Sequence, residues 1–205
     1  MDAIATTGSA VAKLVEQTAY EAGLDLPFAE VRDLQIAAMN ERFQQQVGQI
    51  RLVGLRAADA GITEIACFAD AVPLLLPHTV YKSYPESFLR LGKWDKLTKW
   101  LSTMSMASFD GFDLSGIADI DEWVERLAEA GHYLSCSSGT TGNPALLLSN
   151  RDDVEFASAG MVRSARWATQ MQAMQDRTMF AFSVVTQTPK GKLQMSGSFG
   201  AFLVQ

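Results

Sequence analysis

Hydrophobic and polar positions divide the chain into a helical N-terminal segment and a mixed remainder. The pattern from Asp2 to Thr18 is typical of a short helix, and residues 26–60 are nearly free of helix breakers. Gly61 predicts the end of that long helix, because glycine accepts the left-handed conformation found just past many helix ends. One face of the helix is predicted to be apolar at 4-3-4-3 spacing, through Phe43, Val47, Ile50, Gly54 and Ala57.

Two interpretations of this long helix stay open. Its apolar face favours packing against the rest of the protein, which is the usual fate of such a stripe. The alternative is a helix that binds a partner or forms a homodimer. Both interpretations give a helical N-terminal segment over residues 1–60.

The middle of the chain is broken more often. Pro73, Pro77 and Pro85 divide residues 62–85 into short pieces, because proline ends helices. The stretch from Ala107 to Ala118 is rich in glycine, aspartate and serine, which predicts a loop. Between them we expect a helix over residues 87–104, with its buried face at Phe88, Leu91, Leu97, Trp100, Leu101 and Met104.

Residues 119–185 alternate helices and strands. Asp119 with Glu122 predicts a capped helix start, and Gly131 its end. Apolar runs at residues 133–136 and 145–148 predict two strands, and a further strand is expected at 179–185. Ser149 or Asn150 is expected to cap a helix that runs to about Gln175. The fold class is therefore α/β or α+β, with a domain over residues 61–205.

Charge narrows the classes of partner. The chain of 205 residues has 17 basic and 23 acidic residues, a net charge of -6. This balance argues against broad attraction to nucleic acid or to anionic lipid. No apolar stretch approaches the length of a membrane span, and the N-terminus lacks a secretory signal pattern. We expect a cytoplasmic protein with no nucleic-acid or membrane partner.

The cysteines and histidines do not form a recognisable site. Cys67 and Cys136 lack a CxxC or Cys/His ligand spacing, so neither a disulfide framework nor a structural zinc site is indicated. Cys136 is favoured as a small buried residue rather than a nucleophile. His78 and His132 stand apart, and structural roles are favoured for both. Surface roles are favoured for four cations that a phosphate could otherwise attract, Lys82, Arg151, Lys190 and Lys192.

Residues 137–144, Ser-Ser-Gly-Thr-Thr-Gly-Asn-Pro, carry the clearest chemistry. Gly139 and Gly142 let the backbone approach a ligand closely, so that successive N–H groups point into one anion-sized concavity. The hydroxyls of Ser137, Ser138, Thr140 and Thr141 add hydrogen-bond donors, and polyphosphate is the ligand that best suits them. The segment is not a Walker A loop, because Asn143 and Pro144 follow Gly142 and the next residues resemble a strand.

This segment resembles the phosphate-binding motif of adenylate-forming enzymes, in which the residue after the proline is usually lysine. Ala145 stands there, a departure shared by the branch of phenylacetate-CoA ligases and LuxE-like acyl-protein synthetases. Gly61-Ile62 and the residues over 68–76 and 78–85 also resemble the stretch that precedes the loop in that branch. The resemblance is strong over eight residues, moderate over residues 61–85 and thin elsewhere.

The resemblance implies a reaction and its cofactors. A carboxylate attacks the α-phosphate of ATP, giving an acyl-adenylate and pyrophosphate, and the acyl group passes to a thiol such as coenzyme A or a protein. Mg²⁺ shields the phosphates. The residues expected to hold ATP phosphates are Ser137, Ser138, Gly139, Thr140, Thr141 and Gly142. The carboxylic acid, the metal ligand and the catalytic residue stay unassigned.

Complete members of that family are longer chains, with an acidic metal ligand, a ribose-binding aspartate and a catalytic lysine downstream of the loop. We find no match to those motifs before Gln205, so we expect an N-terminal part of a longer enzyme. The alternative function is non-catalytic: self-association or partner binding through residues 1–60.

Overall fold

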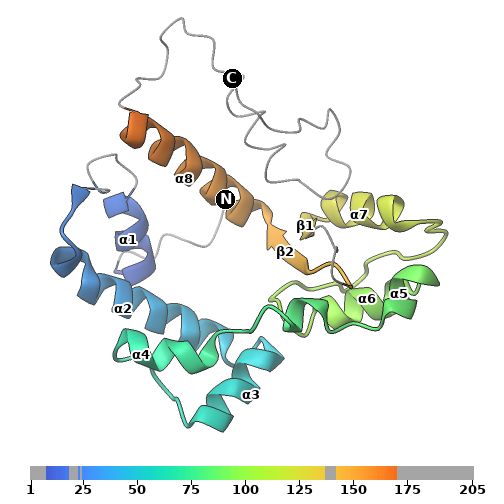
Figure 1. Cartoon of the computed structure of the whole chain (residues 1–205), viewed down its shortest axis with the longest axis horizontal. Helices are drawn as coiled ribbons and strands as arrows, with labels where there is room; N and C mark the ends of the chain where they lie inside the picture. Colours follow the sequence, from blue (N-terminus) through green and yellow to red (C-terminus); the bar gives the residue numbers. More distant parts are fainter. Residues whose placement is uncertain (1–7, 19–22, 24, 137–141, 170–205) are drawn as a thin grey trace, which may run out of the picture. The chain divides into compact units, whose positions relative to one another are not determined.

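A computed structural model describes residues 8–18, 23, 25–136 and 142–169. These residues form two compact units (Figure 1). Unit 1 comprises the described residues within 1–76 and those from 163 onward, and unit 2 comprises the described residues within 77–162. The boundary expected between residues 60 and 61 stays a prediction. Overall, the chain is helix-rich with a small two-stranded sheet, which is compatible with α/β or α+β.

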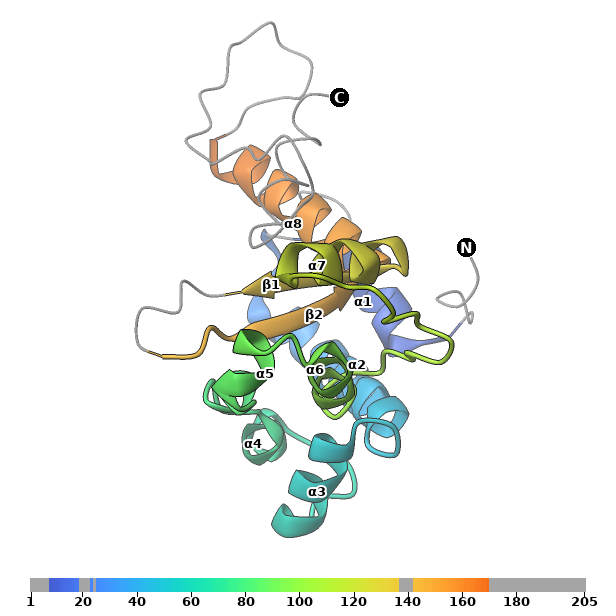
Figure 2. The same ribbon diagram turned by 90° about the vertical axis from the view of Figure 1, so that its right-hand side faces the viewer.

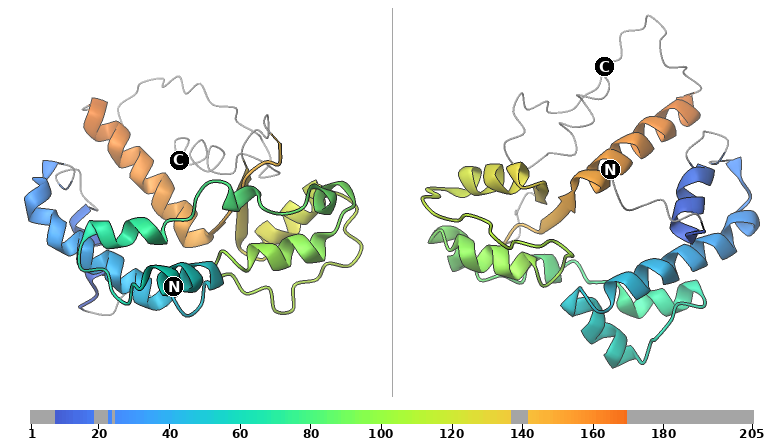
Figure 3. Two further views of the ribbon diagram at one scale, coloured as in Figure 1. Left: turned by 60° about the horizontal axis from the view of Figure 1, so that its bottom comes forward. Right: turned by 180° about the vertical axis from the view of Figure 1, so that it is seen from behind.

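Unit 1 is built from helices. α1 (Ala10–Thr18) packs against α2 (Phe28–Gln46), and α3 (Arg51–Ala60) packs against η2 (Val72–Leu74), a short 3-10 helix that follows α4 (Phe68–Ala71) (Figure 3). The side chain of Trp167, near the end of α8 (Arg151–Thr169), donates to Asp25 Oδ1 at 2.8 Å. The core of unit 1 consists of Phe43, Ala57, Ile65, Ala71 and Leu74.

The single long helix expected over residues 26–60 is wrong. The chain turns between α2 and α3, where Ile50 adopts an extended conformation. A Cβ at Gly54 would lie 2.8 Å from the carbonyl oxygen of Val47, so the corner requires glycine there. The turn brings Ala57 to the same core as Phe43, so Phe43, Ile50 and Ala57 of the predicted face are buried, whereas Val47 and Gly54 are half-buried. Gly61 ends α3 with φ +66°, which confirms its predicted role.

The N-terminus of α1 is capped from another helix. Ser9 Oγ accepts from the backbone N–H of Ala12 at 3.1 Å and donates to Glu41 of α2. Glu41 Oε2 also accepts from the N–H groups of Ala10 at 2.7 Å and Val11 at 3.3 Å. A carboxylate at this position satisfies free N–H groups and complements the positive end of the helix. These bonds, with that of Ser9 foremost, hold the pKa of Glu41 below its usual range.

Unit 2 places helices around a β-hairpin. α7 (Ile120–Glu129) packs against strand β1 (His132–Cys136), which pairs with β2 (Leu146–Asn150) (Figure 2). α5 (Glu86–Arg90) packs against α6 (Trp94–Leu101), and η3 (Val80–Lys82) contacts β2. The buried core draws on these elements through Tyr84, Trp94, Leu97, Leu101, Trp123, Val124, Leu127, Leu134 and Leu146.

The helix expected over residues 87–104 is also two helices. Gly92 lies between α5 and α6 with φ +59°, and the Trp94 indole packs against it. Leu97 and Leu101 are buried as predicted, but Leu91 is 56% exposed, because the turn at Gly92 directs it away from the face that α6 buries. Trp94 instead stacks on Trp123 at 5.6 Å between ring centroids.

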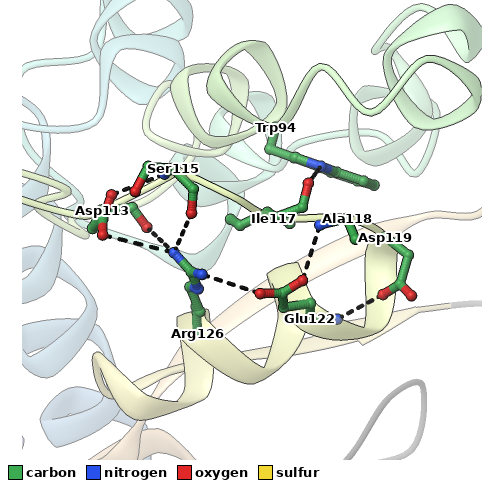
Figure 4. A network of polar contacts seen from close by, with 8 residues as sticks. All are labelled: Trp94, Asp113, Ser115, Ile117, Ala118, Asp119, Glu122 and Arg126. Carbon is green, nitrogen blue, oxygen red and sulfur yellow. Dashed lines mark hydrogen bonds and ion pairs between the residues drawn. The ribbon is translucent and has the colours of Figure 1, made fainter.

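The start of α7 confirms the predicted cap (Figure 4). Asp119 Oδ1 accepts from the N–H of Glu122 at 3.0 Å, and Glu122 Oε2 accepts from the N–H of Ala118 at 2.9 Å. Arg126 then joins the helix to the preceding loop. Its guanidinium donates to Glu122 Oε1 at 3.0 Å and to the carbonyl oxygen of Ser115 at 2.7 Å. Residues 107–118 therefore form an ordered loop that α7 fixes in place.

The start of α8 also carries a predicted cap. Asn150 Oδ1 accepts from the N–H of Asp153 at 2.7 Å, and Asp153 Oδ2 accepts from the N–H of Asn150 at 3.0 Å. The strand predicted at residues 179–185 lies outside the described residues. Within the described part of the chain, no helix has the length and apolarity needed to cross a bilayer.

Candidate functional site

The predicted phosphate-binding segment lies in the connection between β1 and β2. The two strands are antiparallel, with Cys136 opposite Leu146 at the end next to the connection and His132 opposite Asn150 at the other. Of the six residues expected to hold phosphate, Ser137, Ser138, Gly139, Thr140 and Thr141 lie outside the described residues. Gly142 is described and has φ +116°. This backbone conformation is rarely adopted by residues with a side chain.

The C-terminal end of the connection is held by hydrogen bonds to a distant segment. Asn143 Nδ2 donates to the carbonyl oxygen of Tyr84 at 2.7 Å and to that of Lys82 at 3.3 Å. In return, the Tyr84 hydroxyl donates to the carbonyl oxygen of Pro144 at 2.7 Å. We call these three bonds the Tyr84–Asn143 clamp. They join two parts of the sequence about sixty residues apart.

Tyr84 is a firm support for this clamp. Only 2% of the residue is exposed, and its ring meets that of Trp100 edge-on at 4.8 Å between centroids. Trp100 Nε1 in turn donates to Ser83 Oγ at 3.1 Å. Burial, and then the nearby Cys136 thiol, raises the pKa of Tyr84 to about 12. The phenol therefore keeps its proton, and with it the bond to Pro144, throughout the neutral range.

Position 145 is buried. Ala145 is 9% exposed, and the next residue, Leu146, is 1% exposed and belongs to the core of unit 2. A small apolar side chain suits this position, where the family motif usually has lysine. The cation nearest in sequence to the clamp is Lys82, a half-buried residue whose carbonyl oxygen accepts from Asn143. Lys190 and Lys192 lie outside the described residues, and Arg151 is exposed at the start of α8.

The cysteines have local structural surroundings. Cys67 precedes α4, where Asp70 Oδ2 accepts from its N–H at 2.8 Å and from that of Ala66 at 2.9 Å. These bonds hold the pKa of Asp70 below its usual range. Cys136, for which the sequence favoured a buried position, is half-buried at the end of β1 and near Tyr84.

A concave region that the sequence did not indicate lies at the end of the hairpin away from the 137–144 connection. It has a volume of about 370 Å³ and is formed by the 107–118 loop, the end of α7 and His132. His132 Nε2 lies 3.2 Å from the carbonyl oxygen of Ser108, and its ring is 4.9 Å from that of Phe109. These contacts favour the structural role expected for His132, whereas His78 is exposed.

The described residues do not assemble a metal centre. Among residues 8–18, 23, 25–136 and 142–169, no three His, Cys, Asp or Glu side chains lie close enough to hold a metal ion. No step through Mg²⁺ is therefore assigned to them. The sequence singled out the 137–144 and 78–85 segments separately but did not indicate that Tyr84 and Asn143 join them.

Comparison with known proteins adds no relative. The chain matches no protein-family model, no curated protein and no solved structure.

Proposed function

We propose that this chain supplies the nucleotide-binding part of an ATP-dependent enzyme that joins a carboxylic acid to a thiol. The acid is activated as an acyl-adenylate and then transferred to coenzyme A or to a protein. The site is the segment of residues 137–144, whose glycines and hydroxyl residues suit the β- and γ-phosphates.

One observation carries the proposal. The segment that resembles the phosphate-binding motif joins two antiparallel strands, and its end is hydrogen-bonded to the other segment that resembles the same family. A phosphate loop of the Walker type would instead run from a strand into a helix. The strand–loop–strand context therefore favours adenylate formation over transfer of the γ-phosphoryl group.

The backbone has a defined part in this chemistry. Amide groups that point into one concavity stabilise the negative charge that builds on departing pyrophosphate, without needing to reorganise. Because Ala145 replaces the usual lysine, hydrogen bonds rather than a fixed cation would supply this stabilisation. We therefore expect ATP to bind weakly, with a Kd of about 1 mM, which corresponds to roughly -4 kcal/mol.

Calorimetric titration of the protein with ATP in the presence of Mg²⁺ tests the proposal. ATP and inorganic tripolyphosphate should bind and compete for one site, while adenosine should bind more weakly than either. Exchange of labelled pyrophosphate into ATP, with a panel of carboxylic acids, tests the chemistry. Failure of both ATP and tripolyphosphate to bind at millimolar concentration would refute the proposal.

A second candidate function is self-association through unit 1. Phe28, Val72 and Leu75 are 60%, 63% and 65% exposed, which is high for large apolar side chains. Light scattering over a range of concentrations should then show a dimer that Val72→Ser and Leu75→Ser weaken. Leu91→Ser is the matched control, because Leu91 is similarly exposed but belongs to unit 2. A monomer at every concentration would exclude this function.

A further inference from the structure

The Tyr84–Asn143 clamp uses nearly all the polar capacity of the two side chains that form it. Asn143 directs its amide nitrogen to two carbonyl oxygens, and the single hydroxyl proton of Tyr84 goes to Pro144. Neither donor is therefore left for a ligand. Any effect of these two residues on a bound phosphate therefore acts through the backbone of residues 142–144, which their hydrogen bonds hold.

That backbone needs external support. Proline has no N–H, so Pro144 cannot donate to the β1–β2 ladder, and the last register pair is Cys136 with Leu146. The carbonyl oxygen of Pro144 and the side chain of Asn143 thus anchor the residues beyond the end of the paired strands. Gly142, whose φ of +116° is open mainly to glycine, comes immediately before this anchor.

The anchor itself is rigid. Tyr84 is 2% exposed, packs edge-on against Trp100, and is followed by Pro85, the N-cap residue of α5. A donor on a buried, packed ring loses little freedom when it forms its hydrogen bond. The clamp can therefore fix one end of the loop before any ligand arrives, which lowers the ordering cost of binding.

We propose that Tyr84 and Asn143 are positioning residues, which hold Gly142–Pro144 in the conformation that binds the phosphates of ATP. This inference rests on the function proposed above. It adds that the position between the glycine and the proline of the motif serves as an anchor to the 82–84 segment, not as a contact to the nucleotide.

The test combines amide exchange without ligand with phosphate binding. Tyr84→Phe removes one hydroxyl and keeps the ring, whereas Asn143→Ala removes the two bonds of the amide. Each variant should speed hydrogen exchange over residues 142–148. Tyr84→Phe should raise the Kd for tripolyphosphate about 3- to 10-fold, as the loss of one net hydrogen bond predicts, and Asn143→Ala at least as much. Adenosine binding should not change, because the clamp acts on the phosphates.

Thr98→Val is the matched control. Thr98 Oγ1 accepts from Trp123 Nε1 at 3.1 Å in the core of unit 2, so the variant also loses a hydrogen bond of a buried residue but leaves the clamp intact. It should lower overall stability without changing exchange over residues 142–148 or the Kd for tripolyphosphate. If the variants acted only by lowering overall stability, exchange over residues 142–148 and the Kd for tripolyphosphate would change alike in all three.

The outcomes separate the two proposals. If ATP and tripolyphosphate bind but the clamp variants behave as Thr98→Val does, the positioning role is overturned and the proposed function stands. Faster exchange in the clamp variants, with no binding of ATP or tripolyphosphate by the native protein, makes the clamp purely structural and overturns both. Faster exchange together with selectively weaker tripolyphosphate binding supports the inference.

Discussion

Replacing Gly142 with alanine tests the backbone requirement of the proposed phosphate loop. Gly142 has φ +116°, beyond the left-handed helical region near φ +50° to +70° that other residues occasionally adopt. Among the residues that the structure describes, none has an atom within 4 Å of a Cβ built at this position. A steric clash therefore adds nothing, and the effect of the variant comes from backbone conformation alone.

The magnitude follows from two opposing terms. A sparsely populated backbone conformation costs about 1–3 kcal/mol. Alanine also restricts the unfolded chain, which returns roughly 0.4–1 kcal/mol of stability. A net cost of about 1–2 kcal/mol falls on the conformation that binds phosphate, so the Kd for ATP should rise about 5- to 30-fold.

Calorimetric titration with ATP and with tripolyphosphate, beside urea unfolding of each variant, measures both quantities. Gly116→Ala is the matched control, because Gly116 has φ +71° with open space around its Cβ and lies in the 107–118 loop. It should cost stability and leave the Kd unchanged. Equal affinity in native protein and Gly142→Ala, or equal loss in both variants, would refute the reasoning.

Three further predictions concern unit 2. Asp119→Ala should lower the free energy of unfolding by about 1 kcal/mol in urea, because it removes the cap on Glu122; an unchanged midpoint contradicts this. Leu127→Ala should cost about 2–5 kcal/mol, since Leu127 is fully buried, and a smaller loss would mean that the core closes around the cavity. The pKa of Asp113 lies below its usual range, chiefly because Asp113 accepts hydrogen bonds from Ser115. The ionised carboxylate of Asp113 therefore contributes to the free energy of unfolding above pH ~4, and this contribution is lost as the pH falls through the lowered pKa of the folded state. Asp113→Asn should thus lower the free energy of unfolding at pH 7 but not in strong acid.

Signals that act within one turn of chain were readable from the sequence. Gly61 adopts φ +66° at the end of α3, and Asp119 and Asn150 cap α7 and α8 through residues three positions on. In each case the residue and its partner are neighbours in the chain, so residue type and spacing determine the interaction. The two strands that flank residues 137–144 were predicted in the same way, from local runs of apolar residues.

The helix breaks at residues 47–50 and near Gly92 were not readable. Apolar spacing continued across both positions, and local preference alone allowed one helix in each case. Packing in the core favours two helices over one continuous helix at each position. Ala57 packs in the core that contains Phe43, and Trp94 stacks on Trp123. Burial against elements elsewhere in the chain outweighed the helical bonds lost at each turn.

The sequence by itself determined the composition of the loop at residues 137–144 and the caps of the helices beside it. Only the tertiary structure decided what supports them: Glu41 satisfies the start of α1 from another helix, and Tyr84 and Asn143 hold the end of the loop. Such partners lie about thirty to sixty residues apart. A backbone donor or acceptor must be satisfied somewhere, but residue type alone does not state where, because the fold determines which distant side chain comes within 3 Å or so of it.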